Sequence, residues 1–166
     1  MSGSERDFDF LRGHWRTHHR RLRERLVGDD RWDEFQGRCS MQTVMGGFGN
    51  VDDNLLHLPG GDYRAAALRS FDPKTRQWAI WWLDGRNAHT IDAPVVGGFD
   101  ADGTGIFLAD EMIKGQLVRV RFMWTETRSG SPRWAQAFST DAGKTWETNW
   151  TMRFEKVAGE GGPFIG

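Results

Sequence analysis

The side chains best suited to chemistry lie in two short stretches, one from His18 to Arg21 and one from Asp84 to Arg86. Successive side chains of an extended strand point to opposite faces, so His19 and Arg21 share the face of Trp15. An imidazole and a guanidinium inside a protein need an anion, a carboxylate or water as a partner. This pattern indicates a cavity that selects an anionic or polar small molecule. The alternative is a bulge that turns the arginines out to solvent, and alternation alone does not decide between the two.

Further polar residues are expected at the mouth of such a cavity. Asp84 and Arg86 follow a strongly aromatic stretch, and Asn50 and Asp53 lie near the start of an adjacent predicted strand. A carboxylate and a guanidinium at one opening could orient a ligand or take part in acid–base chemistry. A solvated loop held by its own turn hydrogen bonds is the plainer alternative, and we prefer it for Asp52 and His89.

The five histidines do not indicate a metal site. Adjacent histidines in a strand point to opposite faces, and neither an HxH nor an HExxH spacing is present. We therefore predict no metal and no cofactor, and we keep a haem held by one histidine as an alternative.

The tryptophans supply the apolar part of the expected cavity. Those that share parity with the apolar face of their strands either fill a core or form the flat walls of a pocket. Trp81 has the opposite parity and indicates an oligomer surface, so we expect a homodimer. The predicted ligand-binding residues are His19, Arg21, Asn50, Asp53, Trp82, Asp84, Arg86, Trp124, Gln136 and Trp150.

Short segments of alternating or strongly apolar character indicate an all-β protein. They run over residues 14–26, 31–45, 51–58, 63–71, 78–84, 95–99, 105–112, 117–126, 133–140 and 146–155. Gly37 indicates a bulge or bend within the second of them. Hairpin connections favour a closed antiparallel up-and-down barrel of about nine or ten strands, because closure removes the exposed edge strands.

Two segments outside the predicted strands, one at each end of the sequence, have their own expected structure. Residues 6–11 are expected to form a short helical plug that docks Phe8 and Leu11 against the core. We predict a single barrel domain over residues 1–158 and a flexible, glycine-rich tail over residues 159–166.

Composition limits the class of protein. The 166 residues carry 22 lysines and arginines against 23 acidic residues, a formal net charge of -1. This balance argues against a nucleic acid or a membrane surface as partner. Cys39 is the single cysteine, so no internal disulfide is expected, and neither a signal peptide nor a membrane span is visible. We therefore expect a cytoplasmic protein.

Two motifs carry a resemblance to known proteins. Gly13-His14-Trp15 resembles the Gly-x-Trp opening of lipocalins and other calycins, in which the tryptophan packs at the closed end of the barrel beneath an arginine. The resemblance makes Arg153 the candidate for that arginine. The stretches FDFLRGHWRTHHRRL, GGFGNVDDN, LRSFDPKTRQWAIWWLDGR, APVVGGF and WAQAFSTDAGKTWETNW together resemble an uncharacterised bacterial family of small lipocalin-like proteins. This resemblance covers nearly the whole chain and implies a fold but no reaction.

The segment from Ser139 to Trp146 resembles the Asp-box of sialidase propellers, which builds a hairpin and takes no part in catalysis. Asp141 would cap turn amides, Gly143 would supply a positive φ, and Trp146 would cover the hairpin. The chain is too short for a propeller, so we expect a structural turn.

The function that these features predict is binding of a small, partly apolar and anionic molecule in the barrel cavity. The first alternative is an enzyme that acts on a small organic metabolite in the same cavity, with His19 or Asp84 as general base. The others are a haem-binding calycin and an interaction protein whose barrel is packed solid.

Overall fold

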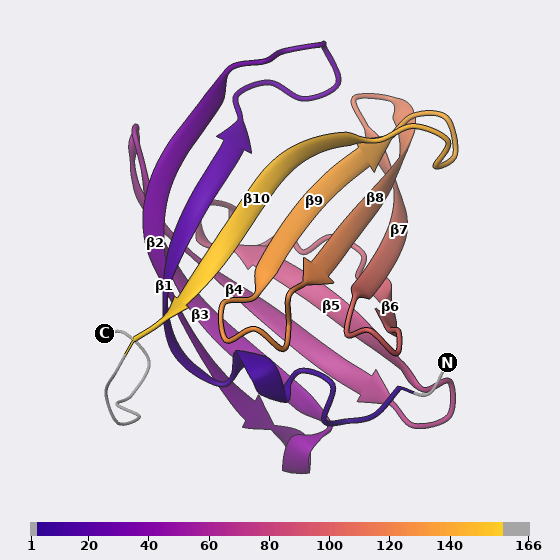
Figure 1. Ribbon diagram of the computed structural model, residues 1–166. Helices are drawn as coiled ribbons and strands as arrows, with labels where there is room; N and C mark the ends of the chain where they lie inside the picture. The colour runs from indigo at the N-terminus through magenta and orange to yellow at the C-terminus, as the bar shows by residue number, and fades with distance from the viewer. Residues whose placement is uncertain (1–2, 158–166) are drawn as a thin grey trace.

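The structure is a closed antiparallel barrel of ten strands (Figure 1). The computed structural model describes residues 3–157. The strands are β1 (Gly13–Leu22), β2 (Trp32–Val44), β3 (Gly49–Leu58), β4 (Gly61–Asp72), β5 (Gln77–Asp84), β6 (Val95–Phe99), β7 (Gly105–Ile113), β8 (Gln116–Thr125), β9 (Arg133–Ser139) and β10 (Glu147–Lys156). Each strand pairs with its sequence neighbours, and β1 pairs with β10 to close the sheet. The predicted all-β class and closed barrel are confirmed, whereas the predicted tail over residues 159–166 lies outside the described residues.

The two ends of the barrel differ. The connections β1–β2, β3–β4, β5–β6, β7–β8 and β9–β10 lie at one end, which we call the open end. The N-terminal segment runs across the other, which we call the closed end (Figure 1). The observed strands match the ten predicted segments except at their ends. The largest difference is in β1, which ends at Leu22 because the next residues form the loop to β2.

The N-terminal segment covers the closed end without forming an α-helix. It contains only a short 3-10 turn, η1 (Asp9–Leu11), so the predicted helical plug is wrong in its secondary structure. Phe8 and Leu11 are nevertheless fully buried, and the Phe8 ring packs edge-on against Trp78 with centroids 5.0 Å apart. Gly13, with φ +103°, turns the chain into β1 directly after this turn, so a longer helix has no room to propagate.

Trp15 is buried at the closed end, but the cation above it is not Arg153. The Nζ atom of Lys156 lies 4.4 Å from the centre of the Trp15 ring and donates a hydrogen bond to the carbonyl of Arg12. The indole N–H of Trp15 donates to the carbonyl of Leu11 at 2.8 Å. Arg153 is exposed, because alternation along β10 turns it away from the interior.

Gly37 does not mark a bulge. It pairs with Thr17 on one side and Leu56 on the other, and neither register shifts at this residue. A Cβ atom at Gly37 would lie 2.5 Å from the carbonyl oxygen of Leu55 and 2.8 Å from Oγ1 of Thr17. The glycine is therefore needed because Thr17 and the Leu55 carbonyl occupy the space beside it.

The irregularity lies instead in β10, where the register with β9 shifts between Thr148 and Trp150. Asn149, the residue between them, is completely buried, and its side-chain oxygen accepts a hydrogen bond from Gln136 at 2.8 Å. This shift leaves Thr148 exposed, while Trp150 is buried in the core.

The hairpin from Ser139 to Trp146 has the geometry that its sequence predicts. The carboxylate of Asp141 accepts hydrogen bonds from the backbone N–H groups of Lys144 and Thr145 and from the Thr145 hydroxyl. Gly143 has φ +89°, and the indole N–H of Trp146 donates to its carbonyl. The hydrogen bonds, first among them the one from Thr145, hold the pKa of Asp141 far below its usual range.

The outer face of β4 to β7 carries an apolar strip in which Leu68, Val96 and Leu108 are exposed. Trp81 is partly exposed beside Leu68, its partner across the β4–β5 pair. Among residues 3–157, no helix is long and apolar enough to cross a membrane.

Candidate ligand-binding cavity

The barrel interior contains a cavity of about 560 Å³. Its middle is walled by three tryptophans, Trp82, Trp134 and Trp150. Trp150 meets Trp134 and Trp82 edge to face, with ring centroids 5.3 and 5.8 Å apart. Toward the closed end, Trp124 lies 5.3 Å from the ring of Phe154 and completes the aromatic lining. These rings offer flat, apolar surfaces to a ligand.

A buried ion pair crosses the interior near the closed end. The guanidinium of Arg69 donates to the carboxylate of Asp52 at 2.6 Å and to the side-chain oxygen of Asn50 at 2.9 Å. The amide of Asn54 also donates to Asp52, and so does the backbone N–H of Ala67 at 3.0 Å. Burying these charges is tolerated because each faces an opposite charge and several hydrogen-bond partners.

Arg69 is also held between aromatic rings. Its Cζ atom lies 5.0 Å from the centre of the Phe8 ring and 5.9 Å from that of Trp124. Its Nε atom and the Nε1 atom of Trp124 have no hydrogen-bond partner among the described residues. The N-terminal segment, through Phe8, therefore helps to position this charge.

His19 is buried behind the tryptophan wall and does not line the cavity. Its ring stacks on Phe35 with centroids 4.6 Å apart. The indole N–H of Trp150 donates to Nδ1 of His19 at 3.1 Å, so Nδ1 is an acceptor and the proton lies on Nε2. Nε2 in turn contacts Oγ1 of Thr17 at 2.9 Å. Burial first, and the nearby charge of Arg21 second, lower the pKa of His19 from 6.5 to about 3, so the imidazole is neutral.

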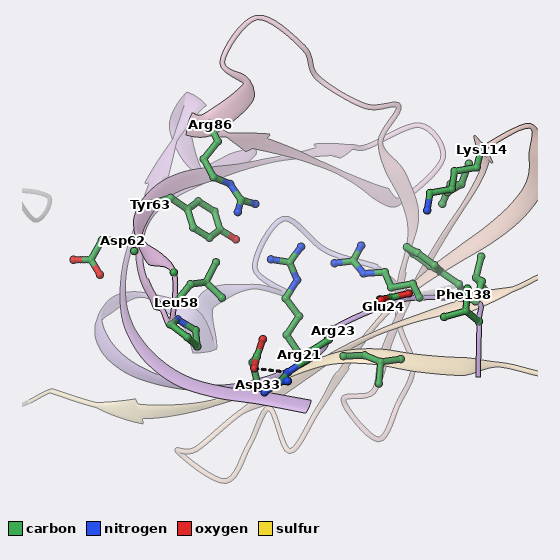
Figure 2. Close-up of a pocket in the computed structure, with 18 of the residues that line it drawn as sticks. Arg21, Arg23, Glu24, Asp33, Leu58, Asp62, Tyr63, Arg86, Lys114 and Phe138 are labelled. Carbon is green, nitrogen blue, oxygen red and sulfur yellow. Dashed lines mark hydrogen bonds and ion pairs between the residues drawn. The ribbon is translucent and has the colours of Figure 1, made fainter. Parts of the chain in front are cut away.

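At the open end the cavity continues into an outer vestibule of about 870 Å³. Arg21, Arg25 and Lys114 line both spaces and so mark the passage between them. Figure 2 shows the side chains of Arg21, Tyr63 and Arg86 pointing into this mouth from different parts of the barrel, with the Tyr63 hydroxyl between the two guanidinium groups.

The arginines of the mouth rest on aromatic rings. The Cζ atom of Arg21 lies 4.8 Å from the Trp150 ring centre, and that of Arg25 lies 5.5 Å from the ring centre of Phe138. Arg86 stacks more closely, with its Cζ atom 3.7 Å from the ring centre of Tyr63. Stacking fixes the planes of these groups and leaves their edges free to donate hydrogen bonds.

These groups affect one another electrostatically. Burial first, then the charge of Arg21, lowers the pKa of Arg25 to about 10. Burial raises the pKa of Tyr63, and the neighbouring arginines oppose this shift. The pKa of Asp84 is lowered, because its carboxylate accepts hydrogen bonds from Arg86 at 2.7 and 3.1 Å. The arginine side of the mouth therefore carries an excess of positive charge.

Two carboxylates lie on the opposite side of the mouth. Glu111 and Asp92 line the cavity there, and burial followed by the charge of Asp92 raises the pKa of Glu111. The mouth thus carries Arg21 and Arg25 on β1 and the loop after it, and Glu111 and Asp92 on β7 and the β5–β6 loop, with Arg86 in that same loop and Lys114 directly after β7.

The structure brings together most, but not all, of the residues predicted for the site. The cavity is lined by Arg21, Trp82, Asp84, Trp124, Gln136 and Trp150, and the vestibule by Arg86. His19 lies behind the tryptophan wall and does not line the cavity. Asn50 lies near the closed end, far from the mouth where it was expected, because β3 starts at that end. Asp53 faces outward and pairs with Arg64 at 3.6 Å.

Several cavity residues were missed in the sequence. The side chain of Arg69 points to the same face of β4 as Ala67 and Phe71, and this face is otherwise apolar. The alternation along the strand could therefore have identified Arg69 as an interior charge. Asp52 and Asn54 likewise share parity with the buried Leu56. Arg25 follows β1 in a loop, where no periodicity indicates the direction of a side chain.

No group of three or more potential metal ligands is present among residues 3–157. Three of the histidines instead have a single polar side chain as partner: Ser40 for His14, Glu155 for His18, and Asp62 for His57.

Comparison with models of known protein families finds no match for this chain, and comparison with curated proteins finds none either. The fold and cavity therefore define the class of the protein on their own. It is a ten-stranded antiparallel barrel with a closed end, an open end and an aromatic interior cavity.

Proposed function

We propose that the protein binds a small, partly apolar and anionic molecule inside the barrel. The observation that carries this proposal is the cavity of about 560 Å³ with tryptophan walls and a guanidinium-lined mouth. Its volume lies within the range of about 300–1,000 Å³ that is typical of small-molecule sites. Aromatic walls with a few polar groups at one end suit a ligand with an apolar body and a polar head.

The enzyme alternative is less well supported by the two candidate bases. Both ring nitrogens of His19 have hydrogen-bonding partners, and its pKa is lowered to about 3. The carboxylate of Asp84 is engaged by Arg86, which also lowers its pKa. A general base needs a pKa closer to the working pH and a free path to its substrate.

We also propose that the barrel is lipocalin-like. The Gly-x-Trp opening at Gly13 to Trp15, the up-and-down closure and the cation over the Trp15 ring support this relationship. The cation in this chain is Lys156 rather than an arginine.

A neutral fluorescent probe, N-phenyl-1-naphthylamine, tests for binding in the cavity independently of ligand charge. We expect its emission to rise on mixing with the full chain and the rise to saturate. Ala67 is buried and lines the cavity, so Ala67→Phe fills the space and should abolish the rise. Ala66, the adjacent residue with opposite parity, provides the control Ala66→Phe, which should leave the rise unchanged.

Native mass spectrometry of the purified protein complements this titration by revealing any ligand retained from the cell. If the probe does not bind, or if both phenylalanine variants bind it as the wild type does, the cavity is not the binding site and the proposal is wrong.

A further inference from the structure

We propose that the ligand is a rigid aromatic monocarboxylate whose carboxylate is bound at the mouth by Arg21 and Arg25. This inference rests on the proposed function and specifies the ligand class and its orientation. The aromatic body would lie inward, among Trp82, Trp134 and Trp150.

Two guanidinium groups at the mouth form no direct ion pair with a carboxylate of residues 3–157. Neither Arg21 nor Arg25 forms an ion pair with a described residue, whereas Arg86 is paired with Asp84 at 2.7 Å. Tyr63 first, and Glu147 second, favour the charged form of Arg25, but neither forms an ion pair with it, and the Glu147 carboxylate accepts a hydrogen bond from the backbone N–H of Leu26 at 2.8 Å. Two unpaired guanidinium groups that repel each other form a favourable site for an anion.

The position of Arg21 determines where the rest of the ligand lies. Its Cζ atom is 4.8 Å from the ring centre of Trp150, whose ring also contacts Trp82 and Trp134 edge to face. A carboxylate held by Arg21 therefore places the attached group against these three indoles. Flat rings fit between edge-to-face indoles better than a flexible chain does, because they lose less conformational entropy on binding.

The size of the cavity sets the length of the ligand. Trp150 and Phe154 are four residues apart on β10, about 13 Å at about 3.3 Å per residue. This span leads from the Arg21 level to the level of Trp124, whose ring is 5.3 Å from that of Phe154. A carboxylate on two fused aromatic rings fits within this length.

The carboxylates of the mouth favour a ligand with a single negative group. Glu111 and Asp92 line the cavity opposite Arg21 and Arg25 and would repel a second anion beside them, and Lys114 offsets only one of these two charges. Arg21 and Arg25 can bind one carboxylate through parallel hydrogen bonds, and the Tyr63 hydroxyl points into the same space (Figure 2).

Isothermal titration of the full chain with 2-naphthoate and its neutral isostere 2-naphthamide, at pH 7 and low salt, tests the proposal. The two differ in charge but hardly in shape. We expect the carboxylate to bind roughly tenfold to a hundredfold more tightly, the range for hydrogen bonds to a charged group. Arg21→Gln and Arg25→Gln should each reduce this preference several-fold, because naphthoate loses a charge-assisted hydrogen bond whereas naphthamide loses at most a weaker one to its neutral carbonyl oxygen.

Arg20→Gln is the matched control, because Arg20 points outward and pairs with Glu34 at 3.1 Å. Thermal denaturation should show that Arg25→Gln melts close to the wild type, since it removes a partly buried charge that forms no ion pair. The assignment of the carboxylate site is wrong if the wild type binds naphthoate and naphthamide equally, or if Arg21→Gln and Arg25→Gln both keep the preference for naphthoate. Either result leaves the proposed function intact. If neither these probes nor N-phenyl-1-naphthylamine bind, the proposed function itself is wrong and this inference falls with it.

Discussion

The indole N–H of Trp150 donates a hydrogen bond to Nδ1 of His19 at 3.1 Å, so a residue of the last strand determines which ring nitrogen of a residue of the first strand carries the proton. The two strands meet only because the barrel closes. Trp150 also forms part of the cavity wall and carries Arg21 on its ring. Barrel closure, the tautomer of His19 and the position of the mouth arginine are therefore coupled through one side chain.

His19 should make folding stability depend on pH. Its pKa is 6.5 when unfolded and about 3 when folded, so between these values the unfolded state binds more protons than the folded state. Stability is therefore expected to fall as the pH is lowered through this window, by about 3–5 kcal/mol in total from this group. His19→Gln keeps an acceptor for Trp150 and does not titrate. Urea denaturation from pH 3 to pH 7 should show a flatter profile for this variant.

The control for this measurement is His57→Gln. His57 is exposed and contacts Asp62 at 2.8 Å, so its replacement should leave the pH profile near that of the wild type. A His19→Gln profile as steep as that of the wild type would show that other groups cause the loss of stability in acid.

Replacing only one partner of the buried Asp52–Arg69 ion pair should strongly lower the free energy of unfolding. Asp52→Asn leaves the buried guanidinium without its counter-charge, and we expect a loss of about 3–5 kcal/mol in the free energy of unfolding. Asp53→Asn is the neighbouring control: that carboxylate is on the outer face, and its pair with Arg64 should contribute less than about 1 kcal/mol. Chemical denaturation measures both, and equal losses would contradict the distinction between inner and outer pairs.

Gly37→Ala tests whether close packing, rather than a bulge, requires glycine in β2. The added Cβ would meet the Leu55 carbonyl at 2.5 Å and the Thr17 hydroxyl at 2.8 Å. We expect a loss of about 1–3 kcal/mol, as for other overpacked interiors. Gly60→Ala, where an added Cβ has no neighbour within 4 Å, should change stability little. Thermal melts of the two variants decide the matter, and a neutral Gly37→Ala would refute the packing explanation.

Lys156 should stabilise the closed end of the barrel, whereas Arg153 should not. Lys156→Ala removes the cation over Trp15 and the hydrogen bond to the Arg12 carbonyl, and the lost cation–π contact alone should cost about 0.5–1 kcal/mol. Arg153→Ala, at an exposed position of the same strand, should change the free energy of unfolding by less than about 0.5 kcal/mol. Urea titrations followed by tryptophan fluorescence compare the two, and the reverse order would restore Arg153 as the partner of Trp15.

The residues of the candidate site could be predicted on strands, where side chains alternate between the two faces, but not in loops, where they do not. Trp82, Trp124 and Trp150 were assigned to the cavity by parity, and they line it. The sequence offered an inward direction for His19 as one of two alternatives, and His19 is buried, but parity does not reveal that Trp150 lies between it and the cavity. Arg25 was missed, because loop backbones have no period that orients their side chains.

Local pattern by itself determined the all-β class, about nine or ten strands, the turns between them and the inward face of most strands, because these depend on residues close together in the chain. Only the tertiary structure decided that Lys156 covers Trp15, that Asp52 neutralises Arg69, and that Arg21 and Arg25 meet at one mouth. Each of these relationships joins different strands, or a strand and a loop, so it depends on barrel closure, register and shear, which no short stretch of sequence encodes.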